Sequence, residues 1–207
     1  MRSYERLRTS MLVASAALGA PLAASAQALG PQRQLLVVEP YYANIQLDHG
    51  KGRGRMSLDG YGARLWVNLA PFSGSSPNVI GKTALALFAH YTPDRGGSDI
   101  TTWHYGAELD THFVDYPIAG RLDPFVSLGA GAFRTRASGA GGAYGAGAAT
   151  STKFAFTPGL GVRVPLANRL QLRGDAHDMI IFSQRQAVGA NRTSNNPEFL
   201  AGLGLTF

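Results

Sequence analysis

Hydrophobic and polar residues alternate with a period of two in eight segments of roughly ten residues, which begin near Leu35. The clearest segment spans residues 103–113. Because successive side chains of a β-strand point to opposite sides, this alternation gives a strand one apolar and one polar face. In this segment the apolar face carries Trp103, Tyr105, Ala107, Leu109, Thr111 and Phe113, and the polar face carries His104, Gly106, Glu108, Asp110 and His112.

The other seven segments repeat this alternation, and we expect their apolar sets to face lipid. These sets are Tyr41, Ala43, Ile45, Leu47; Ala63, Leu65, Val67, Leu69; Leu85, Leu87, Ala89, Tyr91; Val126, Leu128, Ala130, Ala132; Phe154, Phe156, Leu160, Val162; Leu170, Leu172, Gly174, Ala176; and Phe199, Ala201, Leu203, Leu205, Phe207. Pro158 interrupts the sixth segment, and because proline donates no ladder hydrogen bond we expect a bulge or an interrupted register there.

Segments of this length and polarity, separated by Gly, Pro, Asn, Asp and Ser, are typical of a barrel that crosses a membrane with strands. After Ala26 the sequence contains no run of 18 or more apolar residues, so no transmembrane helix is expected in the mature chain. The sequence therefore predicts an all-β fold, an eight-stranded antiparallel up-and-down transmembrane β-barrel over residues 35–207. The absence of cysteine means that no disulfide stabilises it.

The first 26 residues have the pattern of a cleavable signal peptide. Arg2, Arg6 and Arg8 precede the apolar run MLVASAALGA, and Ala24 and Ala26 are the small residues that a signal peptidase requires. We expect cleavage after Ala26, with residues 27–34 as a short lead into the barrel. Removal of residues 1–26 lowers the net charge from +6 to +4.

The last segment, PEFLAGLGLTF, resembles the C-terminal signal of bacterial outer-membrane proteins. More broadly, the signal peptide, the eight segments, DPFVSLGAGAF and PLANRLQLR resemble the small outer-membrane barrels of the OmpA, OmpX and OmpW type. The resemblance implies a place in the outer membrane of a Gram-negative cell, with outer-membrane lipid and lipopolysaccharide around the barrel. It also implies periplasmic chaperones and a barrel-assembly machinery that reads Phe199, Leu203, Leu205 and Phe207.

Aromatic and charged side chains then suggest separate roles for the two faces. Trp103 and Tyr105 at one end of their segment and Phe113 at the other are expected in the aromatic belts at the membrane surfaces. An eight-stranded barrel is just wide enough for side chains to fill it, so inward charges should pair there and close the lumen. The expected lumen network is Arg64, Lys82, Glu108, Asp110, Arg163, Arg173 and Asp175.

The sequence favours neither a metal nor a cofactor. His104, Glu108 and His112 are four residues apart, and on a strand each such step spans roughly 13 Å, too far for one shared ion. Binding of these residues separately, with other strands, is disfavoured but left open. Residues 134–151 are expected to be a surface loop, because their glycine-rich run SGAGGAYGAGAATS lacks the Lys-Ser/Thr of a phosphate loop.

We expect a non-enzymatic barrel with a structural or surface-interaction role. A small pore or hydrophobic-ligand conduit is the main alternative, because inward glycines such as Gly106, Gly159 and Gly202 could leave part of the lumen unfilled. A lipid A-modifying enzyme is a further alternative, with His177, Asp178 and Ser183 as ingredients of a triad. A soluble periplasmic barrel is weaker still. No nucleic acid is expected as a partner, because the basic run of Lys51, Arg53 and Arg55 is a glycine-spaced loop that could rest on lipopolysaccharide phosphates.

Overall fold

A computed structural model describes residues 35–48, 55–69, 82–94, 100–113, 118, 122–137, 149–167, 169–183 and 192–207. Within them lie eight strands: β1 (Leu36–Asp48), β2 (Arg55–Asn68), β3 (Thr83–Thr92), β4 (Ile100–His112), β5 (Asp123–Ala137), β6 (Ala149–Ala167), β7 (Leu170–Ser183) and β8 (Arg192–Thr206). The described part of the chain has no helix long and apolar enough to cross a membrane. The expected signal peptide, with Ala24 and Ala26, lies outside the described residues.

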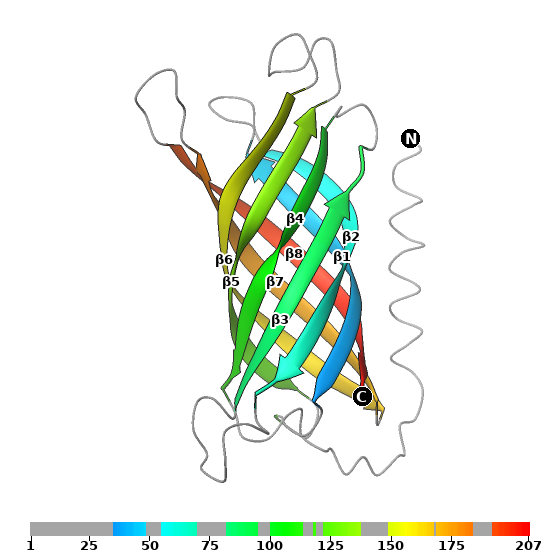
Figure 1. Cartoon of the computed structure of the whole chain (residues 1–207). Helices are drawn as coiled ribbons and strands as arrows, with labels where there is room; N and C mark the ends of the chain where they lie inside the picture. Colours follow the sequence, from blue (N-terminus) through cyan, green and yellow to red (C-terminus); the bar gives the residue numbers. More distant parts are fainter. Residues whose placement is uncertain are drawn as a thin grey trace, which may run out of the picture.

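Each strand pairs with the next in an antiparallel direction, and β1 pairs with β8, so the sheet closes on itself (Figure 1). Val37 at the start of β1 is opposite Thr206 at the end of β8. We call this end of the barrel the terminal end and the opposite one the distal end. The predicted fold class, an eight-stranded antiparallel barrel, is confirmed. Closure matters because it leaves no unpaired sheet edge, which a membrane would not tolerate.

The outer face of the barrel is apolar along most strands, as the alternation predicts. Leu87, Leu109, Leu160 and Leu203 are all exposed on it. Their neighbours in the sequence point inward, where Phe88, Glu108, Asp110 and Gly202 are buried. A band of exposed leucines around a closed ladder is suited to hydrocarbon rather than to water.

The prediction for β1 is wrong, because its two faces are reversed. Tyr41, Ala43, Ile45 and Leu47 are buried in the lumen, whereas Tyr42 is exposed on the outside. The alternation itself is real, but Tyr42, Asn44, Gln46 and Asp48 lie on the side opposite to the one expected, the outer surface. There the Nδ2 atom of Asn44 donates to the Oγ atom of Ser57 on β2 at 2.8 Å, and the hydroxyl of Tyr42 donates to Asp59.

The expected bulge at Pro158 is also not found. Leu128 pairs with Pro158 in an unbroken β5–β6 register. The β6–β7 register is the same before and after this proline. The β6–β7 register instead shifts between Pro165 and Ala167, beside the tight turn into β7. An outward-facing proline lacks only one N–H donor, so one missing bond on the β7 side leaves the register intact.

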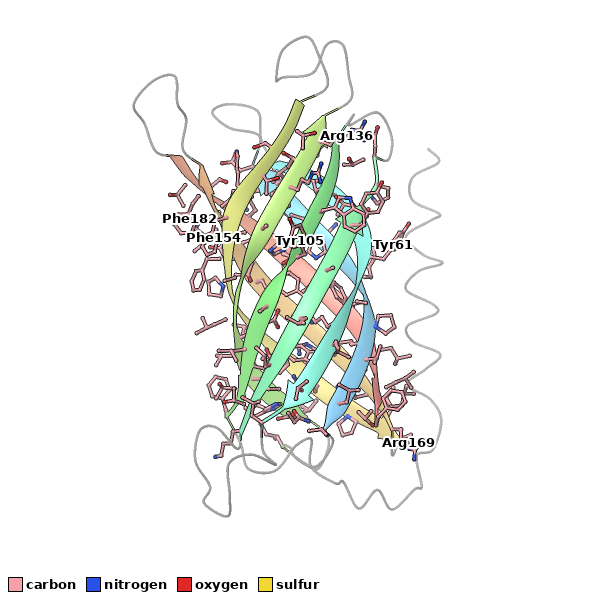
Figure 2. All side chains as sticks on the ribbon, in the orientation of Figure 1. Tyr61, Tyr105, Arg136, Phe154, Arg169 and Phe182 are labelled. Atoms are coloured by element: carbon pink, nitrogen blue, oxygen red, sulfur yellow. The ribbon has the colours of Figure 1, made fainter. Side chains whose placement is uncertain are left out.

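The aromatic residues assigned to the belts all point outward. Trp103 is 48%, Tyr105 46% and Phe113 60% exposed. Trp103 packs beside Tyr91, with 4.7 Å between ring centroids. Figure 2 shows Tyr61, Tyr105, Phe154 and Phe182 at similar heights around the distal half of the barrel. Rings at such a level are suited to the boundary between hydrocarbon and headgroups.

Candidate functional site: the filled lumen

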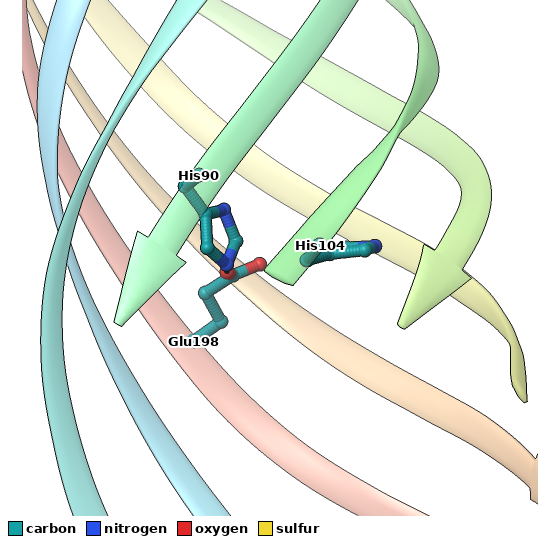
Figure 3. Close-up of side chains that lie close together, drawn as sticks. All are labelled: His90, His104 and Glu198. Carbon is teal, nitrogen blue, oxygen red and sulfur yellow. The ribbon is translucent and has the colours of Figure 1, made fainter. Parts of the chain in front are cut away.

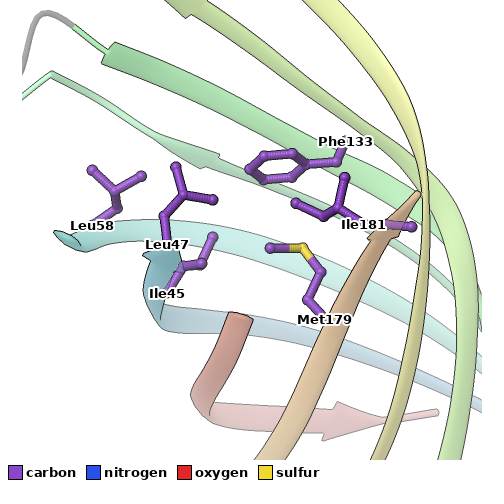
Figure 4. Packing of buried hydrophobic residues seen from close by; sticks show 7 residues of the cluster. Ile45, Leu47, Leu58, Phe133, Met179 and Ile181 are labelled. Carbon is purple, nitrogen blue, oxygen red and sulfur yellow. The ribbon is translucent and has the colours of Figure 1, made fainter. Parts of the chain in front are cut away.

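The distal part of the lumen is closed by an apolar layer, the side chains of Ile45, Leu47, Leu58, Phe133, Ala155, Met179 and Ile181 (Figure 4). These residues come from β1, β2, β5, β6 and β7, so the layer spans the barrel from one wall to the other. Ile45, Ala155 and Met179 have no exposed surface. The layer explains the reversed faces of β1, because here the apolar residues pack against each other inside the barrel rather than against lipid.

Nearer the terminal end lies a charge network in which Arg173 of β7 is the hub. Its Nη2 atom donates to Oε1 of Glu108 at 2.9 Å, and its Nη1 atom donates to Oδ2 of Asp110 at 2.5 Å. Its Nε atom donates to Oδ1 of Asp175 at 2.8 Å. All four side chains are buried. Each carboxylate that Arg173 reaches therefore has a charge-assisted partner in a site with little water.

Two further arginines extend the network. Arg64 of β2 donates to Glu39 at 3.1 Å and to Asp175 at 2.5 Å. Arg163 of β6 shares the Oδ2 atom of Asp110 with Arg173. The network thus joins β1, β2, β4, β6 and β7. Ion pairs between strands that are not neighbours neutralise the buried charges. They also hold the barrel's cross-section in shape.

Two aromatic rings enclose the centre of this network. The guanidinium carbon of Arg173 lies 4.1 Å from the ring centroid of Trp66 and 4.2 Å from that of Phe125. Arg163 lies 5.0 Å from both centroids. A planar guanidinium between two ring faces gains cation–π attraction on both sides while its edges remain free to donate hydrogen bonds.

Six of the seven residues expected in the lumen network are linked there by these ion pairs: Arg64, Glu108, Asp110, Arg163, Arg173 and Asp175. Lys82 lies half-buried just before the first residue of β3. Sequence reasoning missed Glu39 because the faces of β1 were assigned the wrong way round. It also missed the pair of His112 and Asp123, whose Nδ1 and Oδ2 atoms are 2.8 Å apart.

Between the apolar layer and the charge network lies a histidine cluster, which we define as Tyr41, His90, His104, His177 and Glu198. The Nε2 atom of His90 is 3.2 Å from Oε1 of Glu198, and the Nδ1 atom of His177 is 3.6 Å from its Oε2 (Figure 3 shows His90, His104 and Glu198). The rings of His90 and His104 are in edge contact at 5.1 Å. All five residues are buried, and they come from β1, β3, β4, β7 and β8.

His177 and Asp178, two residues of the triad considered as an alternative, do not face each other. His177 points inward, but Asp178 points away from it and accepts a hydrogen bond from Asn195 at 2.9 Å. The side chain of Ser183 lies outside the described residues. His177 instead hydrogen-bonds Ser127 through Nε2 at 3.1 Å and faces Glu198 through Nδ1. The order Ser127, His177, Glu198 resembles that of a catalytic triad. Ser127 is only 1% exposed, however, so its hydroxyl is closed to a substrate from solvent.

Two of the inward glycines on which the pore alternative was based, Gly159 and Gly202, do not leave empty space in the lumen. A Cβ atom at Gly159 would lie 2.0 Å from Cδ2 of His177, and one at Gly202 would lie 2.7 Å from Oε1 of Glu39. Both glycines therefore make room for a large polar side chain of a neighbouring strand.

The sequence does contain a signal for His90 and Glu198, which the expected lumen network did not include. His90 alternates with Ala89 and Tyr91, and Glu198 precedes Phe199, so period two places both on the inward faces of their strands. Which inward residues meet depends on the stagger and tilt of the strands around the closed barrel. The sequence pattern alone does not give that stagger.

Comparisons with known proteins give the fold. A scan against protein-family models and a search of curated proteins found no match. Among solved structures, the chain is similar to Neisserial surface protein A (15% identity, TM-score 0.55, covering 83% of this chain and 97% of that one). It is also similar to Ail of Yersinia pestis (12%, 0.52, 84% and 99%) and to the N-terminal β-barrel domain of Pseudomonas aeruginosa OprF (13%, 0.50, 83% and 97%).

At these identities the likeness concerns the fold alone. The chain has the fold of the small eight-stranded outer-membrane barrels, and the resemblance predicted from the sequence is confirmed at that level. The apolar outer face and these neighbours support the expected location in a bacterial outer membrane.

Proposed function

We propose that this protein is a non-enzymatic, non-conducting outer-membrane barrel that holds its distal loops at the cell surface for interaction with lipopolysaccharide. The observation that carries this proposal is the closure of the lumen at two levels, by the apolar layer and by the charge network. A barrel that is filled with mutually bonded side chains can anchor surface loops in the membrane, but it leaves no path for ions or solutes through the lumen.

The two levels oppose conduction in different ways. The apolar layer offers no ligand to an ion, so an ion that enters it loses hydration without compensation. In the charge network, Arg173 and Asp110 reach across the lumen from β7 to β4. Opening a path there requires separating buried ion pairs, which costs several kcal/mol for each charge left alone.

Basic residues at the distal end fit the surface of lipopolysaccharide. Arg134 and Arg136 of β5 are exposed on the outer face, and Arg134 is opposite Trp103 in the β4–β5 register. Guanidinium groups bind phosphate through paired hydrogen bonds, and an aromatic ring beside them sits at the headgroup level. Figure 2 shows Arg136 near the distal end, far from Arg169 at the terminal end.

A solved structure of the same fold supports a polyanion as partner. Yersinia pestis Ail was solved in complex with the heparin analogue sucrose octasulfate, and that structure has a TM-score of 0.50 and 12% identity to this chain. The phosphates of lipopolysaccharide, like sulfates, present negatively charged oxygen atoms to a guanidinium group.

Conductance in planar bilayers tests the absence of a pore. The folded chain is inserted at several concentrations, and insertion is verified by protease protection. We expect a flat current at 100 mV under conditions in which a general porin, inserted by the same procedure, gives discrete steps. Reproducible steps that scale with inserted protein would overturn the proposal.

Lipopolysaccharide binding is tested with matched arginine variants. Arg134→Gln with Arg136→Gln removes two outward charges at the distal end, whereas Arg169→Gln removes one at the terminal end. We expect the first variant to bind lipopolysaccharide micelles several-fold more weakly at low salt, and the difference to shrink as salt rises. Equal affinity of both variants and the parent would refute the assigned surface.

Mass spectrometry of lipid A tests the non-enzymatic part. Cells that express the protein and cells that lack it are expected to give identical lipid A spectra. A new acylated or deacylated species that depends on the protein would replace this proposal with an enzymatic one.

A further inference from the structure

We propose that the histidine cluster binds one divalent transition-metal ion of the zinc type. The ligands are Nε2 of His90, a ring nitrogen of His104 and Oε1 of Glu198. One ligand atom from each of these residues lies within 4.8 Å of the others. Two imidazoles and a carboxylate are a known ligand set for zinc.

The strongest support is that these atoms lack other partners. Both ring nitrogens of His104 are buried without a hydrogen-bond partner, and the Nε2 atom of His90 and the Oε1 atom of Glu198, which make no regular hydrogen bond, lie 3.2 Å from each other. His104 is 1% exposed. Leaving a buried polar group unsatisfied costs about 1–3 kcal/mol, so such groups that converge on one point indicate an absent partner.

Water does not supply that partner in this geometry. The space that these residues line leaves no room for a water molecule. A metal ion is smaller and binds nitrogen at about 2.0–2.1 Å, well inside hydrogen-bond distance. The three ligand atoms lie within 4.8 Å of one another, so their side chains would draw together around the ion to form such bonds.

Tyr41 and His177 contact the proposed ligands from outside the site and orient their side chains. The hydroxyl of Tyr41 is 3.2 Å from Nδ1 of His90, which leaves Nε2 of that ring to face the site. His177 lies beside the second oxygen of Glu198 at 3.6 Å and is itself fixed by Ser127. Partners of this kind set the tautomer and orientation of metal ligands.

The charge of the lumen also favours a cation. Among the described residues, six buried carboxylates accompany three buried guanidiniums, as follows: Glu39, Glu108, Asp110, Asp123, Asp175 and Glu198 against Arg64, Arg163 and Arg173. Arg64 lines the same space as the cluster, but its guanidinium is bonded to Glu39 and Asp175. A divalent ion at Glu198 offsets part of the negative excess.

A second group with metal-ligand spacing, Glu108, Asp175 and His177, carries no such inference. Arg173 donates to both Glu108 and Asp175, so these carboxylates already have cationic partners. The proposed site differs from this group because both ring nitrogens of its His104 have no hydrogen-bond partner.

Metal binding is measured on the full chain without a polyhistidine tag. The protein is folded in detergent with and without Zn²⁺, dialysed against metal-free buffer, and assayed by elemental analysis. We expect about one zinc per barrel and a higher melting temperature, because an ion that binds only the folded state stabilises it. Folding with Co²⁺ should give a visible absorption that the metal-free protein lacks. Zinc content at the level of the buffer would overturn the proposal.

Variants then locate the ion. His104→Leu removes a ring that has no hydrogen bond to lose, so it should fold, run as a heat-modifiable band and retain less than roughly a tenth of the bound zinc. Glu198→Gln tests a second ligand should His104→Leu fold poorly. His112→Gln is the control and should keep the full zinc content, because His112 pairs with Asp123 and is not a ligand of this site. Loss of zinc in this control, or retention in both ligand variants, would place the ion elsewhere and refute the site.

Discussion

Arg173 on β7 and Asp110 on β4 meet across the lumen, with Nη1 of the arginine 2.5 Å from Oδ2 of the aspartate. The two strands are not neighbours in the barrel. The ion pair therefore ties opposite walls together, in addition to the backbone ladder that joins adjacent strands. Both side chains are buried, so the strength of this link depends on mutual charge compensation.

Replacing Arg173 should be strongly destabilising. Arg173→Met keeps much of the side-chain volume between Trp66 and Phe125 but leaves Glu108 and Asp175 with fewer cationic partners. We expect the free energy of unfolding in urea to fall by about 3–5 kcal/mol. Arg169→Met, at an exposed position in the β6–β7 turn, is the control and should change it by less than about 0.5 kcal/mol. Similar effects of the two variants would contradict the network.

Gly159 and Gly174 form a matched pair for testing the packing of the lumen. A Cβ atom at Gly159 meets the ring of His177 at 2.0 Å, whereas one at Gly174 has no atom within 4 Å. Gly159→Ala should push His177 away from Ser127 and lower the free energy of unfolding by about 1–3 kcal/mol. Gly174→Ala should be neutral within about 0.5 kcal/mol. A harmless Gly159→Ala would show that this part of the lumen is loosely filled.

Adjacent residues of β1 test its reversed faces. Ile45→Asn places an amide in the apolar layer, where it finds no partner, and should cost about 3 kcal/mol of unfolding free energy. Asn44→Leu removes outer-surface hydrogen bonds to Ser57 and Asp59 but adds an apolar side chain there. We expect it to change stability by less than about 1 kcal/mol. The opposite ranking, measured by urea unfolding in detergent, would restore the faces expected from the sequence.

The terminal residue is expected to act during assembly. Phe207 is 68% exposed on the outer face, next to the closing β1–β8 seam, where its N–H donates to the carbonyl of Leu36 at 2.9 Å. Phe207→Asp should lower the amount of heat-modifiable protein in the membrane several-fold, because a charge on the lipid-facing side is unfavourable there. Phe207→Tyr should assemble at the normal level. Equal membrane yields of both variants would argue against Phe207 as an assembly signal.

The architecture and much of the inward face follow from the sequence. Alternation in the segment from Trp103 to Phe113 correctly separates His104, Glu108 and Asp110 from the lipid-facing residues. Charged residues such as Arg64, Arg163 and Arg173 could be assigned to the lumen because an unpaired charge on the lipid face is costly. The signal peptide stays a prediction, because residues 1–26 lie outside the described residues.

The sequence by itself determined that eight strands alternate in polarity and that most polar residues face inward, because period two is a local property of the chain. Only the tertiary structure decided which inward residues meet. It brought His90, His104 and Glu198 together from β3, β4 and β8, and it turned Ile45 of β1 inward against Met179 of β7. The physical reason is that alternation separates two faces without saying which one is the lumen, and the apolar face of β1 packs into an apolar layer inside the barrel instead of facing lipid. Strand stagger in the closed barrel then sets the height at which side chains from opposite walls come into contact.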